Sequence, residues 1–508
     1  IVGELGGLSH LSWVVTGYLL GQTIVTPLYG KLGDLYGRKI VLQSAIVLFL
    51  IGSVLCGMGQ SMTQLILFRF IQGMGGGGLM VTSQAVVGDI VPPRDRGRYQ
   101  GIFGAVFGVA SIAGPLLGGF FTTQMSWRWI FYINIPFGIA AMVVIATSLP
   151  RRPERVRHAI DYAGAALLAV GLSSAVLVSD LGGGVYPWGS PQMLALMALF
   201  AIAVALFIRV EQRAKEPVLP LRLFGDRTFA LSALIGLIVG FALFGSVTYL
   251  PLFLQVVKGS TPTSSGLQMI AMMAGMLITS IVSGQLISRS GHYRKYPIIG
   301  TLIMTSGLFM VSRVSEATPM VLILGYFMML GLGLGFVMQV LVVAVQNAVQ
   351  YRDLGVATSG ATLFRLMGGS IGTAVLGAIF AARLTRELSD ALTAAGVAAP
   401  AGGPGSHGAD LSMQALAGLD PAVRAAYTHA FTASLNTVFV VAACIGLVSF
   451  ILTWMMPEKR LRDTIATSAG DLMHETAEVF PMPVDAEEVQ RELEEGEGEG
   501  QMPKANFN

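Results

Sequence analysis

Charged residues are scarce in this chain of 508 residues. They make up 12% of the sequence, and hydrophobic residues make up 53%, whereas soluble domains carry about 25% charged residues. A soluble protein could not bury so much apolar surface, so the composition excludes that class. The formal net charge is only +3, and such a small surplus does not indicate nucleic-acid binding.

Cysteine is almost absent. The two cysteines, Cys56 and Cys444, lie in apolar runs without histidine or cysteine neighbours at metal-ligand spacing. We therefore expect packing residues, no disulfide framework, no metal site and no cofactor.

Long apolar runs are what the chain has in abundance. Stretches of about 20 apolar residues cross the hydrocarbon core of a bilayer, and they must be helices because an open strand edge leaves backbone groups unsatisfied in lipid. The thirteen predicted spans are 12–29, 41–59, 64–88, 99–122, 129–149, 162–181, 192–208, 229–256, 265–287, 296–312, 318–346, 357–382 and 428–456.

Basic residues orient these spans. One set of alternate loops holds nineteen lysines and arginines, and the other set holds six. The positive-inside rule puts the richer set and the C-terminal tail in the cytoplasm of a multi-pass plasma-membrane protein. Ile1 would then lie outside with no signal peptide to carry it there, so we expect a further span before Ile1, for fourteen in all.

The segment 30–39, GKLGDLYGRK, lies between the first two predicted spans. Gly30 and Gly37 permit a tight chain reversal, Asp34 can cap a helix N-terminus, and Arg38 and Lys39 stay at the cytoplasmic interface. An ordinary basic turn would have the same composition.

A related segment, GQLISRSGHYRK at 284–295, lies between two later spans on the same side. Two such segments at corresponding positions predict a duplicated bundle around a central site. Both resemble the signature loop of the major facilitator superfamily, G-x-L-x-D-R-x-G-R-K, although Leu35 replaces its arginine and Ser288 stands in place of the second aspartate. The resemblance implies an all-α fold of two six-helix halves, with residues 30–39, the latch segment, controlling its conformation.

Arg69 lies inside an apolar span, within LILFRFIQGMG at 65–75. A cation in the bilayer costs about 2.5–3.5 kcal/mol on the insertion scale, so Arg69 needs a partner or a wet cavity, or else it snorkels to the interface. The stretch resembles the family's fourth-span motif, in which the arginine is linked to proton transfer, and nearby Gln72 is a cavity candidate.

The run GVASIAGPLLGG at 108–119 is rich in small residues. Pro115 removes a helix hydrogen bond, and Gly108, Gly114, Gly118 and Gly119 open a face for close packing. A plain glycine-rich helix contact explains this pattern, but the run also resembles the antiporter motif characteristic of exporters.

The string WRWIFYINIPFG at 127–138 suits an interfacial aromatic belt. It also closely resembles a string of fourteen-span drug:proton antiporters, which carry two extra helices between their halves. The resemblance covers residues 1–457 and implies an N-terminal bundle at 1–149, an extra helix pair at 150–225 and a C-terminal bundle at 226–457. Outside the resemblance, composition predicts a low-complexity outer loop at 383–427 and an acidic, disordered cytoplasmic tail at 458–508.

Few groups within the spans could carry a proton, since Asp89, Asp161 and Asp180 fall at span ends. The resemblance implies that the carboxylate lies in the first span of the family, outside the printed sequence, and shares proton transfer with Arg69. For Arg365, inside a later span, substrate contact, charge pairing and helix packing stay open. Met269, Met273 and Phe336 are cavity candidates or plain core residues.

The resemblance implies a non-enzymatic carrier whose partners are protons, small molecules and the bilayer. It would be a monomer that exports hydrophobic or amphipathic, often cationic, drugs by alternating access. A dedicated exporter of one lipid, siderophore or self-made antibiotic is the alternative. A membrane enzyme would need paired acid and base residues at one interface, which we do not find, and a sensor would move no solute across liposomes.

Overall fold

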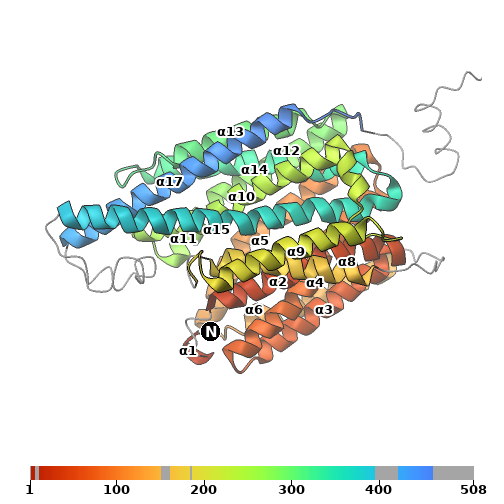
Figure 1. Ribbon diagram of the computed structural model, residues 1–508, viewed down its shortest axis with the longest axis horizontal. Helices are drawn as coiled ribbons and strands as arrows, with labels where there is room; N and C mark the ends of the chain where they lie inside the picture. The colour runs from red at the N-terminus through yellow and green to blue at the C-terminus, as the bar shows by residue number, and fades with distance from the viewer. Residues whose placement is uncertain (1, 6–10, 150–160, 183–185, 395–420, 462–508) are drawn as a thin grey trace, which may run out of the picture. The chain divides into compact units, whose positions relative to one another are not determined.

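The computed structural model describes residues 2–5, 11–149, 161–182, 186–394 and 421–461 (Figure 1). Within these ranges the regular secondary structure is helical, and an isolated bridge joins Gly182 and Tyr186. Eleven of the described helices are long and apolar enough to cross a membrane by length and composition. The prediction of an all-α membrane protein is confirmed.

Each predicted span coincides with one helix or with two adjoining helices. The described helices are α1 (Val2–Leu5), α2 (Leu11–Tyr36), α3 (Arg38–Met58), α4 (Met62–Ile90), α5 (Pro93–Gln124), α6 (Trp129–Tyr132), α7 (Asn134–Ser148), α8 (Tyr162–Leu181), α9 (Pro191–Glu211), α10 (Arg227–Val256), α11 (Pro262–Gln268), α12 (Ile270–Ser290), α13 (Lys295–Val311), α14 (Met320–Ala348), α15 (Leu354–Ala394) and α17 (Pro421–Trp454), with short 3-10 turns η2 (Leu221–Gly225) and η3 (Tyr351–Asp353).

Several helices begin where the sequence supplies a capping side chain. Ser61 accepts a hydrogen bond from the backbone N–H of Gln64 at the start of α4, and Ser190 accepts one from Met193 at the start of α9. Asp226 accepts from Thr228 and Phe229 at the start of α10. These side chains satisfy backbone donors that have no partner within the first helical turn.

Two boundaries differ from the prediction. The latch segment is not an open loop, because α2 continues to Tyr36 and only Gly37, at φ 89°, separates it from α3. The predicted outer loop begins as helix, since α15 has 41 residues and ends at Ala394; its last turns are rich in alanine, leucine, glutamate and arginine, which favour helix. The predicted loop also ends as helix, because α17 begins at Pro421. Its middle part, 395–420, and the tail from 462 lie outside the described residues.

The two halves pack internally in similar ways. In the N-terminal half α4 packs against α2 and α3, and in the C-terminal half α14 packs against α12 and α13, while α10 packs against α15. The halves meet where α5 contacts α12 and where α2 contacts α15. Of the extra pair, α8 packs against α9 and also contacts α2 and α15, one helix from each half.

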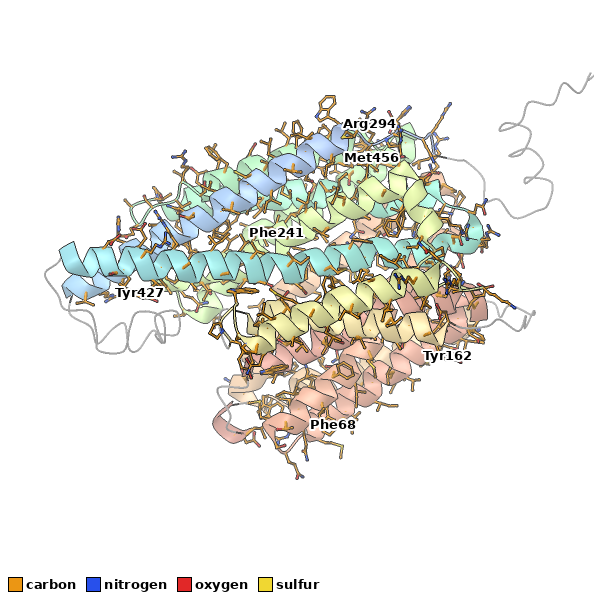
Figure 2. The ribbon with its side chains drawn as sticks, viewed as in Figure 1. Phe68, Tyr162, Phe241, Arg294, Tyr427 and Met456 are labelled. Atoms are coloured by element: carbon orange, nitrogen blue, oxygen red, sulfur yellow. The ribbon has the colours of Figure 1, made fainter. Side chains whose placement is uncertain are left out.

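Large apolar side chains cover the outside of the bundle as well as its core (Figure 2). Phe137, Tyr162 and Ile202 are exposed, whereas Phe241 and its neighbours are buried in the C-terminal half. Apolar exposure on so many helices fits a lipid environment, where the outer faces need not be polar. Below, the basic end is the end of the bundle that holds the latch segment, Arg94–Arg98, Arg289–Lys295 and Arg352.

Candidate functional site

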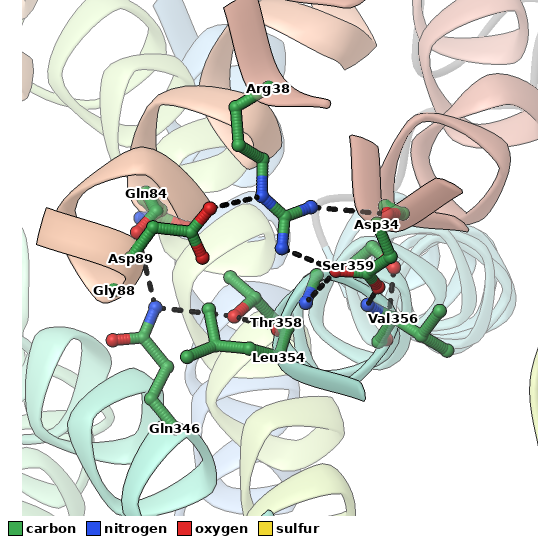
Figure 3. Close-up of polar contacts among 12 residues, drawn as sticks. Asp34, Arg38, Gln84, Gly88, Asp89, Gln346, Leu354, Val356, Thr358 and Ser359 are labelled. Atoms are coloured by element: carbon green, nitrogen blue, oxygen red, sulfur yellow. Dashed lines mark hydrogen bonds and ion pairs between the residues drawn. The ribbon is translucent and has the colours of Figure 1, made fainter. Parts of the chain in front are cut away.

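The latch segment places Asp34 against the other half of the protein. Asp34 lies in the last turns of α2, and its carboxylate accepts hydrogen bonds from the backbone N–H groups of Gly355 (3.1 Å) and Val356 (2.9 Å) at the start of α15 (Figure 3). The N-terminus of a helix carries unpaired N–H groups and a partial positive charge, both of which attract a carboxylate. Asp34 therefore caps a helix N-terminus, as the sequence suggested, but the helix belongs to the opposite half.

Arg38, at the start of α3, forms an ion pair with Asp34 from within the same half of the protein. Its guanidinium is paired with Asp34 and donates through Nε to Asp89 on α4 at 3.1 Å (Figure 3). It also donates to the carbonyl of Gly30. Asp34 and Arg38 are only 7% and 9% exposed, and removing one member of such a buried pair leaves the other charge uncompensated.

Gly37 makes this pairing possible. Its φ of 89° lies in the left-handed region, so the chain turns from α2 into α3 within one residue. Lys39, two residues on, donates to the carbonyls of Ala146 and Leu149 at the end of α7. The latch segment is thereby tied to its own half, and it contacts the other half through Asp34 and through Gly30, which lies against Gly355 and Ser359 of α15.

Further contacts join the halves at the basic end. Arg96 on α5 donates to the carbonyl of Gln346 on α14. The side chain of Gln346 donates to the carbonyl of Gln84 on α4 and to Thr358 on α15 (Figure 3). Gly284 on α12 lies directly against the carbonyl of Gly97 on α5, where a Cβ would have no room. Several independent contacts thus hold the two halves together at this end.

The second copy of the segment differs in its contacts. Gly291, like Gly37, has a positive φ, but it adopts the left-handed helical conformation (φ 70°, ψ 5°), whereas Gly37 has ψ 142°. The turn after α12 is also longer, since α13 begins only at Lys295. Ser288, at the position of the aspartate, donates to Gly284 within its own helix. Its carbonyl accepts a hydrogen bond from Arg94 of the other half at 3.0 Å. The carboxylate-to-helix contact between the halves is therefore made by the first copy.

Arg69 occupies a second polar cluster, inside the N-terminal half. It donates to Gln72 Oε1 (2.6 Å) and to the carbonyl of Val14 (3.2 Å), and its guanidinium stacks over Tyr18 at 4.3 Å. Gln72 in turn donates to Ser53 at 2.7 Å. Among the described residues, these partners include no carboxylate, so Arg69 is a half-buried cation held by dipoles and an aromatic face.

The Arg69 cluster and the latch segment lie at opposite ends of α4. Asp89 is 20 residues after Arg69 on this helix, which corresponds to about 30 Å. A link between the two would therefore pass along the helix and not through direct contact.

Along the glycine-rich run on α5, the first glycine is closely packed against another helix and the later ones are not. A Cβ at Gly108 would touch Leu277 of α12 at 3.3 Å, whereas a Cβ at Gly114, Gly118 or Gly119 would meet no described atom within 4 Å. The close helix contact expected from the sequence therefore occurs only at Gly108 within the described part of the chain. The side chain of Pro115 lies outside the described residues, and α5 continues past it.

The remaining candidates lie in the C-terminal half. Met269 and Met273 are buried in its main hydrophobic core, and Phe336 packs against that core and stacks on Tyr296. Arg365 on α15 is 7% exposed, and its described hydrogen-bond partner is the sulfur of Met80 on α4, 3.9 Å away. It faces the N-terminal half but is not brought together with Arg69 or the latch segment.

Sequence inspection missed the buried glutamines Gln84 and Gln346 and the arginine Arg96. Their signal was available, because an amide inside an apolar span costs free energy unless it is paired. Across the described residues, no cluster of histidine, cysteine and acidic side chains could hold a metal ion.

A sequence profile of the Major Facilitator Superfamily matches residues 1–373. The chain belongs to this superfamily. It is 43% identical to an uncharacterized MFS-type transporter of Mycobacterium tuberculosis, Rv1877, over 93% of this chain and 67% of that protein. It is 42% identical to the multidrug transporter protein MdtP of Bacillus subtilis, over 77% of this chain and 72% of that protein.

Solved structures agree on the major facilitator fold. The proton:xylose symporter XylE has a TM-score of 0.57 at 15% identity, covering 89% of this chain and 86% of that one. The human organic anion transporter MFSD10 has a TM-score of 0.55 at 14% identity, over 87% and 83%. The chain is therefore a multi-pass membrane transporter with efflux-pump relatives, and it is not an enzyme.

Proposed function

We propose that this protein exports small hydrophobic or amphipathic compounds, often cationic, in exchange for protons by alternating access. The observation that carries the proposal is the cap that Asp34 of α2 forms on α15. A contact of this kind between duplicated halves stabilises one state and must break in the other. The multidrug names of the Bacillus subtilis relatives support the class of substrate.

The positions of the latch segment and of Arg69 in the bundle indicate what each does in transport. The basic end faces the cytoplasm of a plasma-membrane protein, as its lysines and arginines require, and the latch segment keeps it closed. Arg69 couples the proton to transport, because a half-buried cation with no carboxylate partner among the described residues responds to any charge that arrives nearby. The carrier works as a monomer.

Transport by the purified full-length protein in liposomes tests the proposal. With a pH difference imposed across the membrane, a cationic dye should move against its gradient, and collapse of that difference should stop it. Arg69→Ala should abolish this movement while the protein still inserts, because the cation between α2, α3 and α4 is lost. Arg313→Ala, at an exposed site between α13 and α14, is the matched control and should transport normally.

Two results would contradict the proposal. Dye transport that does not depend on the pH difference would contradict proton coupling. Full activity of Arg69→Ala would show that Arg69 has no part in the mechanism. Dye transport that never exceeds that of empty liposomes contradicts export of this substrate class.

A dedicated exporter of one compound is the second candidate. It is favoured by relatives from fungi at 30% identity, among them an acurin A biosynthesis cluster MFS-type transporter of Aspergillus aculeatus and the efflux pump FUS6 of Gibberella moniliformis. A panel of chemically unrelated dyes and drugs separates the two candidates, since a dedicated exporter would move one member and leave the others.

A further inference from the structure

A cavity of about 220 Å³ lies between α2, α8, α9 and α15. It brings together one helix from each half and both helices of the extra pair. Its walls are apolar or weakly polar, and its principal lining residues are Thr23, Leu172, Val176, Phe200, Met367 and Ala374. None of the lining residues is charged.

The cavity is closed toward the basic end by a hydrophobic cluster. Leu168 and Leu172 of α8, Phe207 of α9, and Val356 and Ala361 of α15 are buried there together. The same helices that line the cavity are thus tightly packed nearer the latch segment. The cavity begins next to this cluster, where one helix of each half, α2 and α15, meets the extra pair.

At the opposite end, α2 and α8 meet again. Thr16 on α2 donates to Asp180 on α8 at 2.9 Å. Trp188, which also lines the cavity, packs against Gly182 just after α8, and such tryptophans sit at the headgroup level of a bilayer. The cavity therefore lies at the depth of acyl chains, beneath an interfacial tryptophan.

Its mouth opens toward the outside of the bundle. Met197 of α9 and Ile371 and Val375 of α15 line the cavity and are still 38–39% exposed. Along α9 the neighbouring Leu194 and Ile202 are exposed too. Because these surfaces face lipid in a spanning helix, whatever enters through this mouth comes from the hydrocarbon layer.

The hydroxyl groups in the walls offer little to a polar ligand. Thr23 donates to the carbonyl of Leu19 and Ser179 donates to that of Ala175, each within its own helix. Ser370 and Trp188 add one hydroxyl and one indole N–H to the lining, but the other lining side chains are apolar and none is charged. The site therefore favours a ligand with a mainly apolar surface.

We propose that this cavity binds one acyl chain of a membrane lipid. The chain fills the space between α2 and α15 and holds the two halves apart there, while the hydrophobic cluster and the latch segment hold them together at the basic end. Lipid binding favours the state that is closed at the basic end, and the extra pair α8 and α9 forms the outer wall of the lipid site.

A phosphatidylcholine with a photoreactive diazirine in its acyl chain, in nanodiscs with the full-length protein, tests this site. After illumination, mass spectrometry should find the label on peptides covering 172–179 and 367–375. Ala374→Trp fills the cavity and should lower this labelling several-fold. Ala201→Trp, on the exposed face of α9, adds the same side chain outside the cavity and should leave the labelling unchanged.

A milder variant, Ser370→Leu, keeps the test valid if the tryptophan prevents folding, and thermal melting identifies that case. The proposal is wrong if both cavity variants are labelled like the wild type while folded, or if these peptides are not labelled at all. It is also wrong if excess transported dye displaces the lipid label, since the cavity would then be a solute site.

Discussion

Replacement of Asp34 by asparagine should open the basic end. Asparagine keeps the shape but removes the charge, so the contacts with the N–H groups of Gly355 and Val356 weaken and the pair with Arg38 is lost. A hydrogen bond to a charged group contributes roughly 1.5–3 kcal/mol to stability, and asparagine keeps one acceptor oxygen. The closed state should therefore lose about 2 kcal/mol of stability relative to the open state. That loss raises the ratio of open to closed molecules about 30-fold.

A buried cysteine can report this ratio. Ser359 on α15 is fully buried against Gly30 of α2, so a maleimide can reach Ser359→Cys only when the two helices separate. Cys444 is exposed and should be replaced by serine, whereas Cys56 is buried. When the closed state dominates, the labelling rate is proportional to the open population, and Asp34→Asn should raise it about 30-fold.

Asp89→Asn is the matched control. Asp89 also binds Arg38, but both residues belong to the N-terminal half, so the loss should barely change the contact between the halves. The reasoning about the latch segment is refuted if Asp34→Asn labels at the wild-type rate, or if Asp89→Asn accelerates labelling equally.

Two further predictions concern packing and pH. Gly284→Val should also speed the labelling of Ser359→Cys, because the added Cβ has no room against the Gly97 carbonyl. Gly114→Ala should leave the labelling rate unchanged, because no described atom lies within 4 Å of its added Cβ. Equal labelling rates in the two variants would contradict this account. Burial raises the pKa of Asp226 at the start of α10, but hydrogen bonds from Lys459, Phe229 and Thr228 outweigh it, and the net pKa lies below its usual value of 3.8. A carboxylate with a lowered pKa stabilises the folded state above pH 3.8, and this stabilisation is lost as the pH falls through the pKa of the folded state. The melting temperature of Asp226→Asn should therefore lie below that of the wild type at neutral pH and converge with it in acid. A difference in melting temperature that does not change with pH would contradict the pairing of Asp226 with Lys459.

Much of the fold could be predicted from the sequence. The spans follow from runs of apolar residues, which a bilayer forces into helices whatever their partners, and the duplication follows from Gly37 and Gly291 in two similar segments. The kinds of residue in the candidate site were predicted too, since Arg69 and Asp34 are conspicuous charges in or beside apolar spans. The end of α15 was predicted too early because helix propensity continues to Ala394 after the apolar run ends. The end of α2 was predicted too early for another reason, since the contacts of Asp34 with Arg38 and with the start of α15 hold its last turns.

The sequence by itself determined which residues are costly to bury, and the tertiary structure alone decided what satisfies them. Asp34 and Gly355 are 321 positions apart, and no local pattern links a carboxylate on one helix with backbone N–H groups at the start of another. The cavity beneath Trp188 likewise depends on four helices diverging in space. Local chemistry acts over a few residues along the chain, whereas contacts between the halves depend on how whole helices pack, and only the folded protein specifies that.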